Sequence, residues 1–174
     1  MALLTPAEPI RIGNITLRQW EADDAAWYVS NRDEEIFRWT KEPRVLAAEL
    51  LAHVIRQNRR EPRWVGLAIV DTNSGALLGN IALKPDSETT AEVMYWLTPH
   101  ARGRGAATEA VVGLCSWAFA SLHLDRIWLK ANPGNARSRA VASRAGFREC
   151  GVDGQSLVFE RRRDQDAIRA ASDR

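Results

Sequence analysis

The segment that most constrains the fold is a strand, a glycine-rich turn and a helix in direct succession between residues 91 and 122. Residues 91–97 alternate in the way a strand requires. One side carries Ala91, Val93, Tyr95 and Leu97, and the other carries Glu92, Met94 and Trp96. The turn Arg102-Gly103-Arg104-Gly105 follows, and apolar residues then recur at helical spacing as Ala107, Ala110, Val111, Leu114, Ala118 and Leu122. A helix N-terminus has unpaired N–H groups and the positive end of the helix dipole, so this turn predicts an anion site.

The residues of the turn suit a pyrophosphate. Gly103 and Gly105 allow a tight turn and a close approach of the backbone to a ligand. Ala106 and Ala107 keep the first helical turn free of bulk, and Thr108 offers a hydroxyl donor. The pattern is not a P-loop, because no Gly-Lys-Ser/Thr closes it, and it lacks the third glycine of the Rossmann fingerprint. The alternative is a helix preceded by flexible glycines and two solvated arginines.

The same periodicities predict the remaining elements. We expect strands over residues 15–18, 64–70, 76–83, 91–97, 127–130, 147–152 and 157–161. We expect helices over residues 23–31, 47–60, 107–122 and 136–145, the last ending at Gly146. Without repeats or linkers, this order indicates one α/β (α+β) domain over residues 1–162. The charged residues 163–174 are expected to lie outside the core.

The composition excludes several classes of protein. A net charge of +2 is too small to indicate a nucleic-acid partner. Neither an apolar run of the ~20 residues that span a bilayer nor a signal peptide is apparent, so we expect no membrane association. Two cysteines, Cys115 and Cys150, are too few for a disulfide framework or a metal cluster, which favours a cytoplasmic location. Most of the positive charge is arginine, with lysine only at Lys41, Lys84 and Lys130.

Two motifs at a characteristic separation resemble a known family. The Arg-x-x-Gly-x-Ala run at residues 102–107 is similar to the acetyl-CoA pyrophosphate motif of the GNAT N-acetyltransferases, and residues 95–110 are similar to its RimJ/RimL-like branch. Residues 135–138 (Asn-Ala-Arg-Ser) and 144–147 (Arg-Ala-Gly-Phe) resemble a second block of that branch, and residues 78–81 resemble an earlier strand. Met94, where the branch often has glycine, and a short last hairpin depart from the pattern beside the expected acceptor site.

The resemblance implies a GNAT-like fold, with a central mixed, mostly antiparallel sheet of six to seven strands and about four flanking helices. It implies an N-acetyltransferase that uses acetyl-CoA as donor, without a metal or a covalent enzyme intermediate. The acceptor amine would attack the thioester directly in a ternary complex. A protein N-terminus or a small-molecule amine would serve as acceptor, and the chain would be a monomer or a homodimer. The alternative is a non-catalytic acyl-CoA-binding regulatory module.

Three groups are candidates for the chemistry that the resemblance implies. The backbone N–H of Leu97 would stabilise the oxyanion, Ser138 would protonate the leaving thiolate, and Glu92 would act as the base, directly or through water. His100 is an alternative base, although a loop histidine is commonly solvated. The residues expected to bind acetyl-CoA are Trp96, Leu97, Thr98, Arg102, Gly103, Arg104, Gly105, Ala106, Ala107, Thr108, Asn135, Ser138 and Arg144.

Each candidate has a structural alternative. Asn135 could simply cap its helix, and Glu92 could be a solvated or ion-paired residue. Any one arginine of the motifs could be a surface residue. Trp27 and Trp39 are expected to be core residues, with a contact to substrate as the second possibility. Neither cysteine has the histidine context of a nucleophile, so covalent catalysis is not expected.

Overall fold

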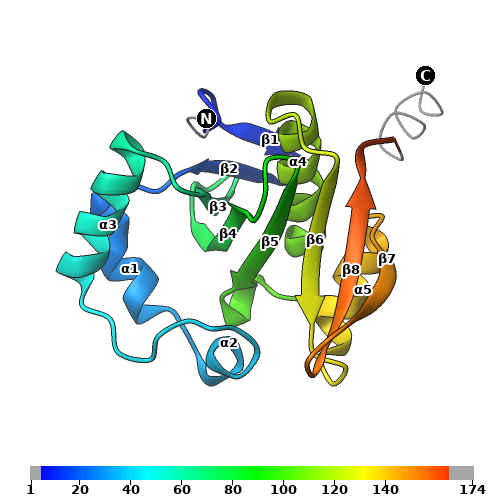
Figure 1. Ribbon diagram of the computed structural model, residues 1–174. Coiled ribbons are helices and arrows are strands. Elements are labelled where there is room, and N and C mark those ends of the chain that lie inside the picture. Colours follow the sequence, from blue (N-terminus) through cyan, green and yellow to red (C-terminus); the bar gives the residue numbers. More distant parts are fainter. Residues whose placement is uncertain (1–4, 165–174) are drawn as a thin grey trace.

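The computed structural model describes residues 5–164, which are organised around one twisted sheet (Figure 1). Within these residues, eight strands lie in the order β1-β2-β3-β4-β5-β6-β8-β7. Their bounds are β1 Ile10–Ile12, β2 Ile15–Gln19, β3 Val65–Asp71, β4 Leu77–Pro85, β5 Thr90–Leu97, β6 Arg126–Ala131, β7 Arg148–Asp153 and β8 Ser156–Arg162. Every neighbouring pair is antiparallel except β5 and β6, which are parallel.

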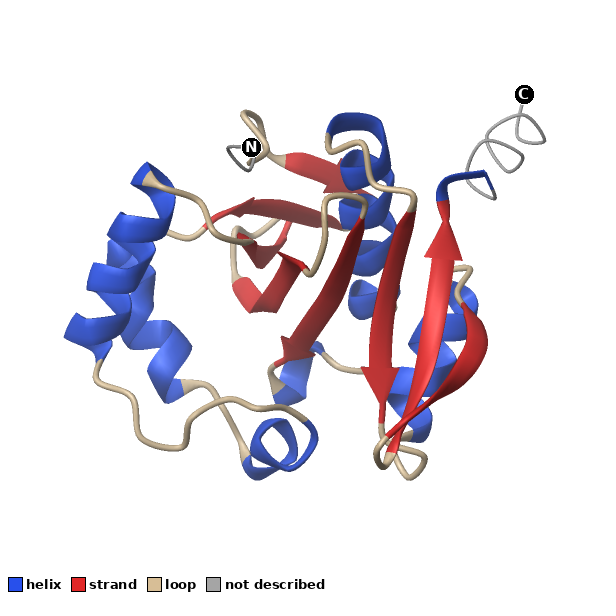
Figure 2. Cartoon of the chain, in the orientation of Figure 1, coloured by secondary structure: helices blue, strands red, loops and turns tan. Residues whose placement is uncertain are grey.

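Helices lie on both sides of the sheet (Figure 2). The described α-helices are α1 Ala25–Ser30, α2 Glu34–Trp39, α3 Ala48–Arg60, α4 Ala106–Ser121 and α5 Ala136–Arg144, with short 3-10 turns at Ala22–Asp24 and Pro99–Ala101. The predicted fold class is therefore confirmed. The counts are higher than expected, with eight strands in place of six to seven and five α-helices in place of about four.

The alternation of side chains along the strands produces two cores. Leu67 and Ile69 of β3 join the main core with the buried face of α4, whereas Ala68 and Val70 of the same strand join a second core with α1, α2 and α3. The predicted apolar positions of α4 are all buried. Burial of alternate residues against helices on opposite faces fixes the register, because a slip by one residue would exchange the two faces.

Two short elements were not predicted. β1 has only three residues and pairs with β2 across a tight turn in which Gly13 has a φ of 55°. α2 has six residues, too few for a helical period to be read. A local signal for α2 was nevertheless present: Asp33 caps it by accepting a hydrogen bond from the Ile36 N–H, and two glutamates occupy its first turn.

The predicted ends of the other elements are close to the observed ones. Gly146 follows α5 with a φ of 83°, and the Phe147 N–H donates to the Ala142 carbonyl, as expected for a C′ glycine. Arg163, in the predicted tail, donates to the Leu124 carbonyl, and residues 165–174 lie outside the described residues. Between residues 5 and 164, no helix is long and apolar enough to cross a membrane.

Candidate functional site

The parallel strands β5 and β6 separate along their length. They are paired only at Thr90–Glu92 with Arg126–Trp128, although β5 continues to Leu97 and β6 to Ala131. Beyond these pairs a groove of about 1210 Å³ opens, lined by both strands, the turn before α4, the start of α5 and residues of α2 and α3. The divergence exposes the edge of β5 within the molecule, which is unusual for a central strand.

The end of β5 presents a backbone N–H to this groove. The Thr98 N–H donates to the Leu78 carbonyl of β4 at 2.9 Å. Because N–H groups alternate along a strand, the Leu97 N–H and C=O point the other way, toward the gap between β5 and β6. The Leu97 carbonyl accepts a hydrogen bond of 3.1 Å from Arg102 Nε. The predicted oxyanion donor, the Leu97 N–H, therefore faces the groove, whereas the Leu97 carbonyl is bonded to Arg102.

Close packing of β4 against β5 holds this strand end in place. Gly79 is the cross-strand partner of Leu97. A Cβ at Gly79 would collide with the Trp96 carbonyl oxygen. Thr98, which is fully buried, donates from its hydroxyl to the Leu78 carbonyl at 3.0 Å. These contacts leave the Leu97 amide little freedom to move.

The glycine-rich turn has the conformation that the sequence predicts. Gly103 and Gly105 have φ values of 77° and 85°, in the left-handed region that favours glycine. Gly105 is the N-cap of α4, and the groove is lined here by Gly103, Gly105, Ala106, Ala107 and Thr108. The N-terminal amides of a 16-residue helix therefore border the groove, as an anion site requires.

The arginines of the motifs are placed differently from one another. Arg102 donates two hydrogen bonds of 2.8 Å to the Asp33 carboxylate and one of 2.9 Å to Glu35. Arg104 is exposed and is not among the groove-lining residues, whereas Arg144 is exposed and lines the groove. The phosphate contacts predicted for the three side chains stay predictions. For Arg102 the structure provides another role, since its guanidinium already binds α2.

α2 is connected to both sides of the groove. Glu35 accepts hydrogen bonds from Arg102 in the turn before α4 and, at 3.0 Å, from Arg137 in α5. A Cβ at Gly134, in the loop before α5, would lie 3.6 Å from the Trp39 ring. Asp33 and Glu35 were not predicted as site residues, because the six residues of α2 are too few to show a helical period.

Asn135, Ser138 and Tyr95 form a connected group on the other side of the groove. The Asn135 side chain accepts a hydrogen bond of 3.1 Å from the Ser138 N–H and caps α5. The Ser138 and Tyr95 hydroxyl oxygens are 3.1 Å apart. Burial raises the pKa of Tyr95, so the phenol keeps its proton at neutral pH. Tyr95 was not predicted as a site residue. The sequence did contain a signal for it, because Tyr95 is the polar residue among the apolar residues on one side of its strand.

Glu92 lies where β5 and β6 begin to separate. It lines the groove, with Lys84 of β4 and Trp128 of β6 as its cross-strand neighbours. His100 is less well placed as a base, because its Nε2 is 3.3 Å from the Thr98 hydroxyl and it is not a groove-lining residue. Glu92 therefore remains the better candidate.

Aromatic side chains form the wall beneath α1 and α3. Trp96 is buried, stacks on Trp27 at 6.3 Å and packs edge-on against Tyr28 at 4.9 Å. Glu42 accepts hydrogen bonds from the Tyr28 hydroxyl at 2.7 Å and the Trp96 indole at 3.3 Å. Trp27 thus belongs to the second core, as predicted, whereas Trp39 lines the groove. The role of Glu42 was not predicted.

Comparison with known proteins identifies the family of this chain. Residues 14–148 match the model of a family described as the acetyltransferase (GNAT) domain. The chain is 39% identical over 79 residues to the protein named "Putative ribosomal N-acetyltransferase YdaF" of Bacillus subtilis. That match covers 44% of this chain and 43% of the relative, so it spans less than half the length of either protein.

Two solved structures share the fold at lower identity. Mycobacterium smegmatis RimJ in complex with CoA-disulfide is 22% identical, with a TM-score of 0.73 over 94% of this chain and 93% of that one. Spermidine N-acetyltransferase from Vibrio cholerae, in complex with CoA and spermine, is 20% identical, with a TM-score of 0.72 over 84% of this chain and 93% of that one.

Proposed function

Because this chain belongs to the GNAT acetyltransferase family, we propose that it is an N-acetyltransferase that moves the acetyl group of acetyl-CoA onto a primary amine. The observation that carries the proposal is the convergence of three groups on one groove. These are the Leu97 N–H, the N-terminus of α4 and the Tyr95–Ser138 pair, which meet where β5 and β6 separate.

The donor half of the groove fits the phosphates and arm of acetyl-CoA. The α4 N-terminus and the left-handed glycines at 103 and 105 offer backbone N–H groups to a pyrophosphate. Nothing lies within 4 Å of a Cβ placed at Gly103, so this side of the turn is open. Asn135 and Arg144 line the same half of the groove from α5. The similar structure of Mycobacterium smegmatis RimJ is a complex with CoA-disulfide, which supports this assignment.

The chemistry divides among the residues around the thioester. Acetyl-CoA supplies an acyl group on a good leaving thiolate, and a neutral amine attacks its carbonyl in a ternary complex. Glu92 lies five residues, ~17 Å, from Leu97 along β5, so it accepts the proton of the attacking amine through a chain of water molecules. The Leu97 N–H stabilises the oxyanion, for which a single well-placed donor is worth ~10²–10³-fold in rate. The Tyr95–Ser138 pair donates a proton to the thiolate and is reprotonated by solvent, to which Glu92 gives up the proton of the amine.

The acceptor half lies between the sheet and the helices α1–α3. Its wall includes Trp20, Tyr28 and Met94, and it remains open enough for a protein N-terminus or a small amine. The ribosomal name of the Bacillus relative supports a protein N-terminus.

The decisive experiment measures acetyl-CoA-dependent release of thiol with a panel of peptide N-termini and small amines. We expect release with at least one amine and N-acetylated product by mass spectrometry. Acetyl-CoA binding is measured in parallel by calorimetry. Binding without thiol release from any amine would instead identify the chain as a non-catalytic acyl-CoA-binding module.

A further inference from the structure

All the lysines of this chain lie around one groove. Of its 24 basic residues only Lys41, Lys84 and Lys130 are lysine, and all of them line the groove that also holds Glu92. Lysine is a compact, strongly hydrated point charge on a flexible stem, whereas arginine is a planar fork. The lysines of this chain thus occur only at this groove, where arginines such as Arg59 and Arg102 also lie, and the groove gathers positive charge.

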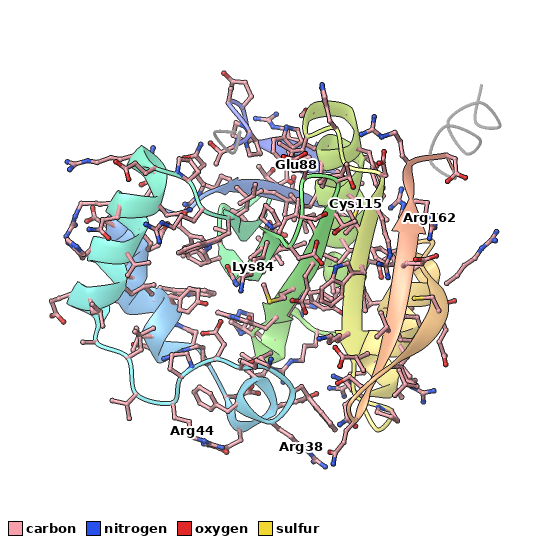
Figure 3. All side chains as sticks on the ribbon, viewed as in Figure 1. Arg38, Arg44, Lys84, Glu88, Cys115 and Arg162 are labelled. Carbon is pink, nitrogen blue, oxygen red and sulfur yellow. The ribbon has the colours of Figure 1, made fainter. Side chains whose placement is uncertain are left out.

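Two of the lysines flank Glu92 on the open face of the sheet. Lys84 is its cross-strand partner on β4 and is exposed, in the space between α3 and β5 (Figure 3). Lys130 follows Trp128, the β6 partner of Glu92, by two residues and so lies on the same face. The pKa of Lys130 is raised, first by its hydrogen bond to Asp153 and, among smaller causes, by the charge of Glu92.

Lys41 belongs to the same group of charges. It lies in the loop after α2 and contributes to the lowered pKa of Asp153, whose main cause is the hydrogen bond from Lys130. Lys130 is thus already paired, with an Nζ–carboxylate distance of 2.6 Å. No carboxylate among residues 5–164 forms an ion pair with Lys84 or Lys41. Arg59 of α3 also lines the groove without such a pair.

Most of the carboxylates that line the groove already have hydrogen-bond partners and provide few contacts for a cationic ligand. Glu42 accepts hydrogen bonds from Tyr28, Trp96 and Arg32, and Glu35 is bound by Arg102 and Arg137. Glu92 is left as the acid that faces the open groove, beside Lys84 and near Lys130. The charge still available to a ligand in the acceptor half is therefore positive.

We propose that the acceptor is the N-terminus of a peptide that carries acidic side chains at its second to fourth residues, with Lys84 as the principal contact. This inference rests on the proposed function. A lysine that is exposed and has no ion-pair partner satisfies an incoming carboxylate without first losing another contact. The same positive charge favours the neutral form of the attacking amine and repels polyamines.

Spacing along the sheet selects a peptide over a free amino acid. Leu97 is five residues beyond Glu92, which is ~17 Å along the strand at about 3.3 Å per residue. The Lys84 side chain spans part of this distance. A free amino acid cannot span the rest, because its α-carboxylate carbon is only two bonds from its nitrogen. In an extended peptide, a side chain at the third or fourth residue reaches this far.

The test compares peptide acceptors that share an N-terminal residue and differ at positions two to four, with glutamate, glutamine or arginine there. Arginine replaces lysine because it adds no second primary amine. We expect kcat/KM to be roughly fivefold to tenfold higher for the glutamate peptide than for the glutamine peptide, and lowest for the arginine peptide and for spermidine. Raising the salt concentration should narrow these differences.

Charge variants assign the preference to the lysine. Lys84→Gln should reduce the glutamate-to-glutamine ratio to near one, and Lys84→Glu should favour the arginine peptide. Arg11→Gln, at an exposed position of β1 away from the groove, is the matched control and should leave the ratio unchanged. An equal or higher kcat/KM for the glutamine or arginine peptide would overturn the inference, as would acetylation of free glutamate at the rate of the glutamate peptide.

Failure of the proposed function gives a different result. Without thiol release from any acceptor, the enzymatic assignment fails. Calorimetry with the N-acetylated glutamate and glutamine peptides then decides the inference separately, because this binding needs no turnover. Equal affinities of the two peptides would overturn it.

Discussion

Arg102 faces Asp33 through two parallel hydrogen bonds, each 2.8 Å long. The same guanidinium donates from Nε to the Leu97 carbonyl. One side chain therefore joins the cap of α2 to the residue whose N–H faces the groove. Such a bidentate pair fixes orientation as well as distance. We infer that Asp33 helps to position the Leu97 amide through Arg102.

The substitution Asp33→Asn isolates this contact, because asparagine is also a good N-cap and can still accept from the Ile36 N–H. We expect kcat to fall several-fold and the free energy of unfolding to fall by about 1 kcal/mol, given the partial exposure of the pair. Steady-state kinetics and urea denaturation measure the two effects. Glu34→Gln is the control, because Glu34 belongs to the helix that Asp33 caps and its ion pair with Arg44 of the following loop is exposed. Equal losses of kcat in both variants would contradict a specific role of Asp33.

The ion pair also predicts how stability depends on pH. The hydrogen bond from Arg102 is the main cause of the lowered pKa of Asp33. A carboxyl with a lower pKa in the folded chain stabilises it above the unfolded value of about 3.9, and this contribution is lost as the pH falls through the folded pKa. The stability difference between the parent and Asp33→Asn should therefore be constant near neutral pH and should shrink in acid. Unfolding midpoints measured between pH 7 and pH 3 test this, and a difference that grows in acid would contradict it.

Gly105→Val should weaken the binding of acetyl-CoA without unfolding the chain. A residue with a Cβ at a φ of 85° costs about 1–2 kcal/mol, and valine would also obstruct the backbone amides of the turn. Gly75→Val provides the matched control, because Gly75 has a φ of 73° in the turn between β3 and β4 and no neighbour within 4 Å of its Cβ. Calorimetric titration should show loss of affinity in the first variant only. Unchanged affinity in a folded Gly105→Val would argue against the phosphate turn.

Elements with a long period or a strong turn signal were predictable from the sequence. The alternation in β5, the glycines before α4 and the apolar face of that helix are local features, and the structure has all three. β1 and α2 were missed because three and six residues are too short to display a period. The Asn135 cap was also predictable, because it depends on residues only three apart.

Contacts between distant parts of the chain were not predictable. Arg102 and Asp33 are 69 residues apart, and Tyr95 and Ser138 are 43 apart. The sequence does not show that β6 pairs beside β5. Without that pairing it gives no reason to place the Tyr95 hydroxyl near Ser138 at the start of α5. The arginine of the motif suggested a phosphate ligand because guanidinium groups suit phosphates, but a carboxylate on α2 satisfies the same geometry.

Glu92→Gln tests the base. The rate should rise with pH, because the amine must lose a proton before it attacks. Removal of the carboxylate should lower kcat/KM by ~10²-fold or more and flatten or displace the acid limb of its pH profile. Glu88→Gln, at an exposed glutamate in the turn before β5 (Figure 3), is the control. A profile of Glu92→Gln that overlays the parent would exclude Glu92 as the base and favour His100 or a chain of water molecules.

The Tyr95–Ser138 pair leads to the most specific prediction. If the proton for the thiolate passes through these hydroxyls, Tyr95→Phe and Ser138→Ala should each lower kcat by ~10²–10⁴-fold. Affinity for acetyl-CoA should change much less, since one lost hydrogen bond costs about 0.5–1.5 kcal/mol, roughly a factor of two to twelve.

The double variant separates a shared proton path from two independent contacts. Either substitution interrupts the same path, so the double variant should be no slower than the slower single variant, whereas independent contributions would multiply. Stopped-flow measurement of thiol release at saturating acetyl-CoA isolates the chemical step from product release. Parent rates in both single variants would show that the thiolate leaves without a proton from this pair. That outcome is chemically reasonable for a leaving group whose conjugate acid has a pKa of about 8.5, and it would leave Tyr95 and Ser138 with a purely structural role between β5 and α5.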